Sequence, residues 1–305
     1  MARPARIVRG DRVTLAAFLV TVVLAGLNFV GVRFSNRELP PFEGAALRFA
    51  AAAVLFFAFT RARAIPLPRR RGLVGALLFG LLAFFGSYAL AYWGLVSAPA
   101  GLGSVSFALV PLITAVLAVV HGLEPLRPRS LLGGAVAAIG IAIVFSDQLS
   151  ASVPVAALAA LFVGAATAAE AGVVIKYFPR SHPAATNAVA MAVGAVGLTG
   201  LSLIAGERWV VPASTTTIVA FCYLVVSTIG LFALGLYVLG RWTATATSFQ
   251  FPLSPLVTVA AAAVLAGETV SPNFLVGGVL VLGGVIAAAS GRTATRQAAP
   301  SLRPA

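Results

Sequence analysis

The sequence has very little charge. Asp, Glu, Lys and Arg together make up 10% of its 305 residues, whereas 60% of the residues are hydrophobic. A water-soluble domain of this length would need much more polar surface to cover its core. The mean hydropathy is +1.02, and many apolar runs approach the ~20 residues that cross a hydrocarbon layer. The composition therefore predicts a membrane protein.

Cysteine and histidine are also scarce, which excludes several kinds of site. Cys222 is the single cysteine, so no intrachain disulfide can form, and no metal-ligating residues surround it in the sequence. His121 and His182 are the two histidines, and both lie near the ends of apolar runs. Neither an HExxH motif, a GxSxG motif nor a phosphate-binding loop occurs. We therefore expect no catalytic residues, no metal, no cofactor and no ATPase subunit.

Acidic residues are few as well, with 8 Asp and Glu against 21 Lys and Arg, which gives a net charge of +13. A basic balance can indicate nucleic-acid binding. Here, however, the Arg residues lie between apolar runs, so we expect the lipid bilayer to be the partner and expect no nucleic acid. The apolar run 13–32, which follows an Arg-rich N-terminus, is too long for a cleaved signal peptide, so we expect a retained first helix.

Charged residues, Pro and Gly divide the apolar sequence into ten expected helices. They lie near residues 13–33, 44–60, 72–93, 99–121, 130–146, 153–175, 184–205, 214–239, 244–266 and 273–290. The short connections favour antiparallel neighbours. The sequence thus predicts an all-α integral membrane protein with ten transmembrane helices.

Basic residues outside these helices fall mainly on one side. Seventeen lie in the N-terminus, 61–71, 122–129, 176–183, Arg241 and the C-terminal tail, and only Arg33, Arg37 and Arg208 lie on the other side. Cytoplasmic loops carry the Lys and Arg excess. We therefore expect a multi-pass protein of the inner (plasma) membrane with both termini in the cytoplasm.

The chain contains an internal repeat. Residues 86–146 and 230–290 match at a fixed offset of 144, with 20 of 61 positions identical. Low-complexity Ala, Gly and Val sequence raises such a count, but Pro111 and Thr114 also fall on Pro255 and Thr258. We expect a first five-helix repeat in 1–148 with a basic N-terminal arm, a second in 149–291, and a disordered basic cytoplasmic tail in 292–305.

Five is an odd number, so the second repeat enters the membrane from the opposite side. Inverted repeats of this kind build secondary transporters, with the substrate site near the midplane where the halves meet. A channel or a non-transporting scaffold is the alternative, although no ring of charge or filter sequence is visible. An intramembrane enzyme is the least favoured interpretation, because no nucleophile and base are found together.

Two motifs resemble a known family. In each half, a proline is followed thirteen residues later by Glu (Pro111 and Glu124, Pro255 and Glu268), and PFEGAALRF (41–49) places Arg seven residues after Pro. Over roughly 13–290 the chain resembles the EamA-type family of the drug/metabolite transporter superfamily. The resemblance implies a secondary-active or facilitated transporter of small organic metabolites, working by alternating access, with export of amino acids or related solutes foremost.

Charged and amide side chains inside the spans are the first candidates for a substrate site. Glu170 can pair with a substrate amine or carry a proton; alternatively it is a neutral, hydrogen-bonded acid or extends towards Lys176. Asn28 is its counterpart in the first half and can contact substrate or join helices. Arg48 can bind a substrate carboxylate; alternatively it pairs with Glu43 or reaches the headgroups. Ala190 stands at the matching position of the second half.

Aromatic side chains give a second set of candidates. Phe85, Tyr88 and Tyr92 share a helical face, and this stripe can stack on a planar or apolar substrate. Core packing or an interfacial belt is the alternative. Phe232 is the counterpart of Tyr88 and is expected to line the other half of the cavity.

Neutral polar residues and prolines complete the expected site. Ser106, Gln250 and Ser254 can bind a zwitterion without a fixed charge, although Ser often bonds its own helix backbone. Pro111, Pro252 and Pro255 interrupt backbone bonding in their spans. They are expected to act as hinges, with static kinks as the alternative.

Overall fold

The structure is a computed structural model that describes most of the chain. The described residues are 9–122, 128, 132–137, 139–140, 142–143, 153–179, 181–239, 241, 250–267 and 269–290. Within these residues there are helices and turns but no strands. In the described part of the chain, seven helices are long and apolar enough to cross a membrane, and two shorter apolar helices accompany them. The expected all-α membrane architecture is thereby confirmed. Glu124, Glu268 and the tail 292–305 lie outside the described residues.

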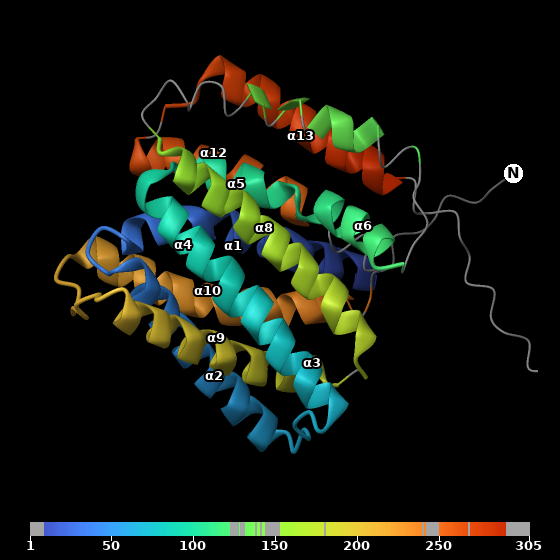
Figure 1. The fold of residues 1–305 in the computed structure, drawn as a ribbon, viewed down its shortest axis with the longest axis vertical. Helices are drawn as coiled ribbons and strands as arrows, with labels where there is room; N and C mark the ends of the chain where they lie inside the picture. Colours follow the sequence, from blue (N-terminus) through green and yellow to red (C-terminus); the bar gives the residue numbers. More distant parts are fainter. Residues whose placement is uncertain are drawn as a thin grey trace, which may run out of the picture.

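The helices pack side by side in one bundle (Figure 1). The first half forms α1 (Arg9–Ser35), α2 (Pro41–Ala62), α3 (Arg71–Phe79), a π-helical segment (Gly80–Gly86), α4 (Ser87–Ser97), α5 (Ala100–Ala108) and α6 (Val110–Val120). The second half forms α8 (Val155–Val174) with a 3-10 turn (Ile175–Tyr177), then α9 (Pro183–Ile204), α10 (Thr215–Leu239), α12 (Gln250–Ala266) and α13 (Pro272–Ser290). Residues 132–137 are also helical, within the expected fifth span.

Proline breaks one span and leaves its counterpart continuous. α5 ends and α6 begins around Leu109, because Pro111 has no N–H to donate to the carbonyl of Phe107. α12 runs through Pro255, where the hydroxyl of Ser254 donates to the Phe251 carbonyl that the proline leaves unbonded, at 3.0 Å. The residue that matches Ser254 in the first half is Val110, which has no hydroxyl.

Contacts between the two halves follow an approximate two-fold symmetry. α2 packs against its counterpart α9, and α5 packs against its counterpart α12. α1 packs against α10 and α12, while α8, the counterpart of α1, packs against α4 and α5. Exchanging the halves therefore converts each of these contacts into another one that is present.

Matched glycines give the direction of this symmetry. A Cβ on Gly140 would lie 2.6 Å from the carbonyl oxygen of Gly277, and a Cβ on Gly284 would lie 2.5 Å from that of Gly133. Gly133 and Gly140 match Gly277 and Gly284 at the offset of 144. The contacts pair the later glycine of one helix with the earlier glycine of the other, so the two helices run antiparallel. The symmetry axis is then perpendicular to the helices, which is the geometry of an inverted repeat.

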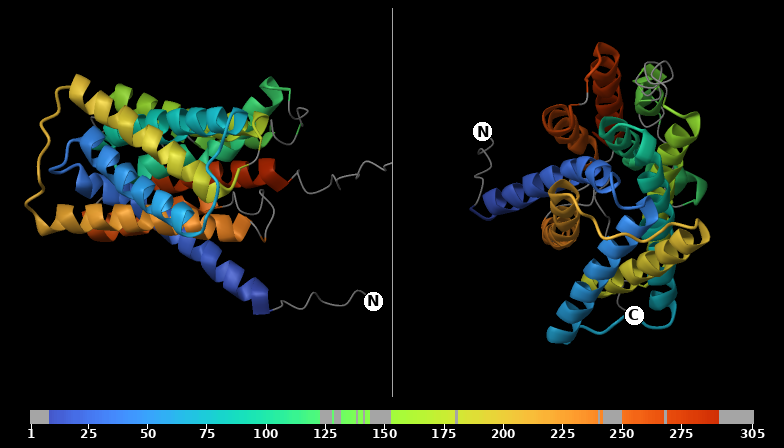
Figure 2. Two further views of the ribbon diagram at one scale, coloured as in Figure 1. Left: turned by 90° about the horizontal axis from the view of Figure 1, so that it is seen from below. Right: turned by 90° about the vertical axis from the view of Figure 1, so that its left-hand side faces the viewer.

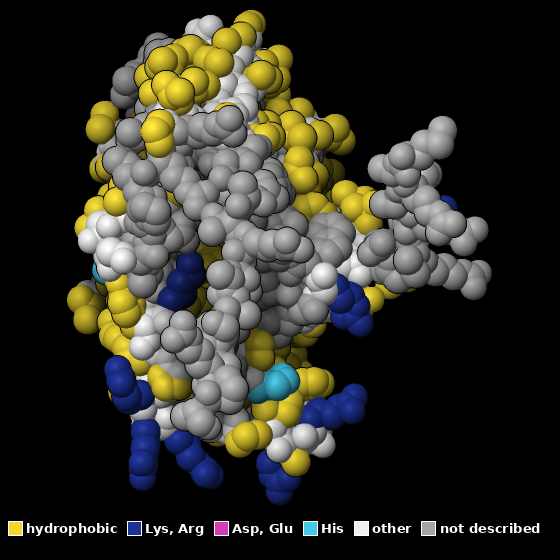
Figure 3. All heavy atoms as spheres, turned by 90° about the vertical axis from the view of Figure 1, so that its right-hand side faces the viewer, with side chains coloured by type: hydrophobic (Ala, Val, Ile, Leu, Met, Phe, Trp, Pro, Cys, Tyr) yellow, Lys and Arg dark blue, Asp and Glu magenta, His cyan; other side chains and the backbone are white. Residues whose placement is uncertain are grey.

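The two ends of the bundle differ in charge. The α2–α3 connection (63–70) and the α8–α9 connection (178–182) lie at one end, which we call the basic end (Figure 2). It exposes Lys, Arg and His side chains, and no acidic side chain is visible among the coloured atoms of this face (Figure 3). The α1–α2 and α9–α10 connections lie at the opposite end, which contains Glu38 and Glu207.

Candidate functional site

A small cavity lies inside the bundle, between the halves. Its volume is about 110 Å³, and residues of α1, α2, α4, α5, α10 and α12 line it. Five of the residues expected at a substrate site line this cavity: Asn28, Arg48, Tyr88, Tyr92 and Ser254. A concave, largely apolar space with a few polar groups is typical of a small-molecule site. Among the described residues, no group of three His, Cys, Asp or Glu could hold a metal ion.

Arg48 is the charged residue of the cavity. It lies seven residues after the first residue of α2, or about 10 Å along the helix, and its side chain is 1% exposed. Its Nε donates to the hydroxyl of Thr228 at 2.5 Å, and its Nη1 donates to the hydroxyl of Tyr92 at 3.3 Å. Thr228 in turn donates to a backbone carbonyl of α10. These contacts fix the direction of the guanidinium.

The same guanidinium retains one nitrogen whose N–H donors are unused. Its Nη2 is buried and has no hydrogen-bond partner, and no described carboxylate forms an ion pair with it. A buried charge without a partner costs several kcal/mol. A carboxylate bound in the cavity would remove this cost and accept charge-assisted hydrogen bonds from Arg48.

Aromatic rings cover one side of the guanidinium. The centroid of Tyr88 is 5.5 Å from the Cζ of Arg48, and its ring meets Phe49 edge-on at 4.6 Å. Tyr88 also neighbours Phe84 and Tyr92, with centroids 6.3 Å apart in both pairs. The row of neighbouring rings next to Arg48 is therefore formed by Phe84, Tyr88 and Tyr92. Phe85 instead packs against α9 at Gly197. The π-helical segment 80–86 accounts for this one-residue difference from the expected stripe, because it alters the helical phase.

The second half of the chain completes the cavity. Asn28 accepts a hydrogen bond from Ser227 of α10 at 2.7 Å through its Oδ1. Phe107 and Phe251, which match at the offset of 144, both line the cavity. Sequence reasoning did not propose them, although their identity at equivalent positions was the available signal. It also missed Thr228, whose partner Arg48 is 180 residues away.

Four expected site residues lie outside the cavity lining: Ser106, Glu170, Phe232 and Gln250. Phe232 packs on Phe84, with centroids 5.4 Å apart. Ser106 is fully buried and its hydroxyl has no partner. The Oε1 of Gln250 is likewise buried without a hydrogen bond. The expected hinges Pro111, Pro252 and Pro255 all lie within helices. Pro111 follows the break between α5 and α6, and Pro252 lies near the start of α12.

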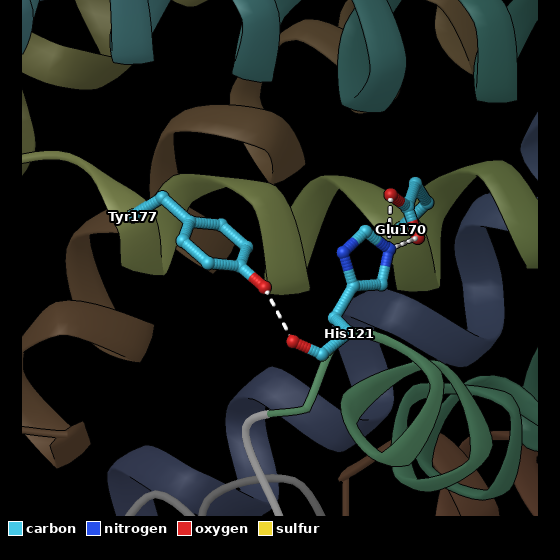
Figure 4. A network of polar contacts seen from close by, with 3 residues as sticks. All are labelled: His121, Glu170 and Tyr177. Atoms are coloured by element: carbon cyan, nitrogen blue, oxygen red, sulfur yellow. Dashed lines mark hydrogen bonds and ion pairs between the residues drawn. The ribbon is translucent and has the colours of Figure 1, made fainter.

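Glu170 also lies outside the cavity, at the basic end. Its Oε1 is 2.9 Å from the Nε2 of His121, as Figure 4 shows. The hydroxyl of Tyr177 donates to the backbone carbonyl of His121 at 3.0 Å. His121 follows α6 of the first half, whereas Glu170 and Tyr177 belong to the second half. These contacts, which we call the histidine latch, therefore join the halves on the basic side of the cavity.

Three carboxylates join the halves at the opposite end. Glu207, after α9, accepts hydrogen bonds from the backbone N–H groups of Phe42 and Glu43 at 3.1 and 3.0 Å. Glu43, in the first turn of α2, accepts from the N–H of Val210 at 3.1 Å. We call Glu38, Glu43 and Glu207 the carboxylate latch, and we call this end of the bundle the latch end.

Glu38 forms the third part of the carboxylate latch. It accepts hydrogen bonds from the backbone N–H groups of Ala213 at 2.8 Å and Ser214 at 3.1 Å. These bonds, above all the backbone bond from Ser214, hold the pKa of Glu38 below its ordinary value of 4.5. The cavity thus lies between two sets of polar contacts, and each set connects the first half of the chain to the second.

Comparison with known proteins agrees with this architecture. The sequence profile of the EamA-like transporter family matches residues 13–146 and again residues 155–290. The chain belongs to the EamA-like transporter family. The expected family resemblance is thereby confirmed, and the EamA-like profile matches once in each half of the chain.

Relatives of this EamA-like chain are transporters by name. One is the "Probable amino-acid metabolite efflux pump" of Salmonella typhimurium, which is 29% identical over 283 residues, covering 88% of this chain and 91% of the relative. Another is the "Uncharacterized inner membrane transporter YedA" of Escherichia coli (strain K12), which is 28% identical over 274 residues, covering 88% and 89%. The EamA-like chain is therefore a membrane transporter.

A solved crystal structure shares the EamA-like fold. It superposes with a TM-score of 0.66 at 18% sequence identity, and the match covers 91% of this chain and 96% of the other. At this identity the likeness concerns the fold alone.

Proposed function

We propose that the protein is a secondary transporter that exports small amphipathic carboxylates, amino acids foremost, from the cytoplasm by alternating access. The buried, incompletely paired guanidinium of Arg48 at the wall of the central cavity is the observation that carries the proposal. The proposed substrate-binding residues are Asn28, Arg48, Tyr88, Tyr92 and Ser254. The name of the Salmonella relative, an amino-acid metabolite efflux pump, supports this class of substrate.

Each group of the cavity has a role in this proposal. Arg48 binds the substrate carboxylate through its free Nη2, and the rings of Tyr88 and Phe107 contact the apolar part of the substrate. The carbonyl oxygen of Asn28 and the hydroxyl of Ser254 are acceptors for a substrate ammonium. No carboxylate lines the cavity in the described chain, so the carboxylate of the substrate is its main point of attachment.

The two latches support alternating access. Opening one end requires its latch to break while the other remains closed, which is the behaviour expected of inverted halves that rock about a central site. In this scheme, the histidine latch of His121 and Glu170 gates the basic end. The carboxylate latch gates the latch end.

Charge distribution supports the orientation. The basic end carries the Arg residues of 61–71 and Lys176, and this Lys and Arg excess supports a cytoplasmic location for it. Both termini are then cytoplasmic, in the inner membrane. The repeats span 1–148 and 149–291 in this proposal.

Ligand-induced thermal stabilisation in detergent tests the carboxylate requirement. The probes are leucine, 4-methylpentanoate and 3-methylbutylamine, which share one apolar side chain. Leucine carries both charged groups, 4-methylpentanoate only the carboxylate, and 3-methylbutylamine only the amine. A ligand that binds the folded state raises the unfolding temperature. We expect leucine and 4-methylpentanoate to stabilise the protein, and 3-methylbutylamine to have no effect.

Two variants of Arg48 sharpen this test. Arg48→Lys keeps the charge but loses the planar pair of donors, and Arg48→Gln loses the charge. We expect about a tenfold loss of carboxylate affinity for Arg48→Lys and a larger loss for Arg48→Gln. The unfolding temperature without ligand reports whether each variant folds. Stabilisation by 3-methylbutylamine, or unchanged leucine affinity in a folded Arg48→Gln, would contradict the proposal.

A further inference from the structure

Another cavity, with a polar lining, lies at the latch end, next to the largely apolar central one. Its volume is about 270 Å³, and its lining includes Arg33, Asn36 and Arg37 from the C-terminal end of α1 and the residues after it. Leu95 and Val96, at the C-terminal end of α4, also line it. We call this cavity the vestibule.

Leu95 lines both the vestibule and the central cavity. Its side chain is 1% exposed, and its backbone carbonyl accepts a hydrogen bond from the Nη1 of Arg33 at 3.1 Å. The same Nη1 is 3.1 Å from the carbonyl of Val96. The two cavities thus share one lining leucine, whose backbone carbonyl accepts a hydrogen bond from a vestibule arginine.

The described lining of the vestibule carries positive charge. It includes the guanidiniums of Arg33 and Arg37 and no carboxylate of the described chain, and of the two Arg33 is already engaged with other groups. The guanidinium of Arg37 lies over the ring of Phe34, 4.3 Å from the centroid, which leaves its donors available. The carboxylates nearby in sequence, Glu38 and Glu43, instead accept hydrogen bonds from backbone N–H groups of 210–214. A cleft lined by one sign of charge concentrates ions of the opposite sign.

One polar atom of the vestibule is buried and unused. The amide nitrogen of Asn36 donates to the backbone carbonyl of Tyr92, a central-cavity residue, at 3.0 Å. The Oδ1 of the same amide is buried without a partner. Asn36, a lining residue of the vestibule, therefore has an unused acceptor and is next in sequence to the cationic Arg37, a combination that suits a zwitterion.

We propose that the vestibule is a second binding subsite for the substrate carboxylate, on the route between the central cavity and the non-cytoplasmic compartment, with Leu95 as the septum between the two subsites. This inference rests on the proposed function, since it assumes a carboxylate substrate. The carboxylate passes from Arg48 to Arg37 when the side chain of Leu95 moves aside.

Counterflow of radiolabelled leucine in membrane vesicles of both orientations tests the subsite. Right-side-out vesicles present the vestibule to added leucine, and inside-out vesicles present the basic end; vesicles without the protein give the background. For Arg37→Gln we expect the half-saturating leucine concentration to rise about fivefold in right-side-out vesicles and less than about twofold in inside-out vesicles. Arg37 lines the vestibule and not the central cavity, so the effect is expected on the vestibule side alone.

Arg208→Gln is the matched control. Arg208 is exposed at the same end and carries the same charge, but it does not line the vestibule. We expect less than about a twofold effect in both orientations. Equal shifts for Arg37→Gln and Arg208→Gln would overturn the subsite, because surface charge alone would then explain them. An equal shift of Arg37→Gln in both orientations would overturn it as well.

A second pair of variants tests the septum. Leu95→Ala shortens the side chain between the two spaces, and we expect exchange of leucine at saturation to be about threefold faster or more. Leu102→Ala is the control, since Leu102 is equally buried in the first half but does not line the central cavity or the vestibule. Equal exchange rates for the two variants would overturn the role of Leu95. If only the vestibule proposal is wrong, leucine binding still depends on Arg48. If the proposed function is wrong, leucine binding does not depend on Arg48.

Discussion

Loss of the Glu207 carboxylate is expected to open the latch end. Glu207 accepts hydrogen bonds from the N–H groups of Phe42 and Glu43 and from the hydroxyl of Ser202 at 2.6 Å. Both N–H groups belong to α2, in the other half of the chain. Glu207→Gln replaces one acceptor oxygen with an NH₂ group, so one of the bonds between the halves is lost. In the proposed scheme, the two bonds to α2 form only when the latch end is closed, so the variant is expected to destabilise the closed state selectively.

The size of the effect follows from the kind of bond. A hydrogen bond to a charged group contributes about 1.5–3 kcal/mol, and every 1.4 kcal/mol changes an equilibrium about tenfold. Glu207→Gln is therefore expected to increase the population open at the latch end by about 10- to 100-fold.

A cysteine in the cavity reports this opening. Ala91 lines the central cavity, so Ala91→Cys is introduced together with Cys222→Ser. The rate of modification by a membrane-impermeant maleimide is measured in right-side-out vesicles. We expect Glu207→Gln to raise this rate about 10- to 100-fold when opening is in rapid equilibrium.

Glu170→Gln is the control for direction. It weakens the histidine latch at the other end, so it is expected to raise the labelling rate in inside-out vesicles and not in right-side-out vesicles. An unchanged rate for Glu207→Gln, or an equal rise from both sides, would refute the reasoning.

Three further predictions concern packing, the cavity and pH. Gly284→Ala places a Cβ 2.5 Å from a backbone oxygen, whereas a Cβ on Gly283 would meet no atom within 4 Å; Gly284→Ala is expected to lower stability by about 1–3 kcal/mol and Gly283→Ala to leave the thermal midpoint unchanged. Thr228→Val leaves the Nε of Arg48 unpaired, so leucine affinity measured by thermal stabilisation is expected to fall about tenfold, with Thr228→Ser restoring it. The pKa of Glu38 is lowered, so its carboxylate stabilises the fold at neutral pH and loses that contribution as pH falls below 4.5. The thermal midpoint of wild type is expected to exceed that of Glu38→Gln at pH 7, and the difference is expected to shrink in acid; a difference independent of pH would contradict this.

Residue patterns were enough to predict the membrane fold and the repeat. Apolar runs set the spans, and the offset of 144 paired Gly133 and Gly140 with Gly277 and Gly284, which meet reciprocally in the structure. Polarity within apolar spans also identified Asn28 as a residue that comes to the cavity. These features can be predicted from sequence because the bilayer thickness sets the length of each apolar span and the helix period sets where its apolar residues recur.

Contacts between residues far apart in the chain could not be predicted from the sequence in the same way. Glu170 was expected near the substrate, but the structure places it beside His121, 49 residues earlier. Glu207 meets a backbone N–H group 165 residues away, and backbone groups leave no signature in residue types. The shift from Phe85 to Phe84 coincides with a π-helical segment bounded by Gly80 and Gly86, and glycines are too common in this chain to mark such a segment in the sequence.

Counterflow in proteoliposomes tests the central claim most directly. Vesicles loaded with excess unlabelled leucine are diluted into a trace of labelled leucine, and the internal label is followed with time for wild type and for Arg48→Gln. The account predicts that wild type transiently accumulates label above its equilibrium level and that folded Arg48→Gln does not. Simple equilibration by wild type, or an undiminished transient in Arg48→Gln, would contradict a carrier whose central arginine binds the substrate.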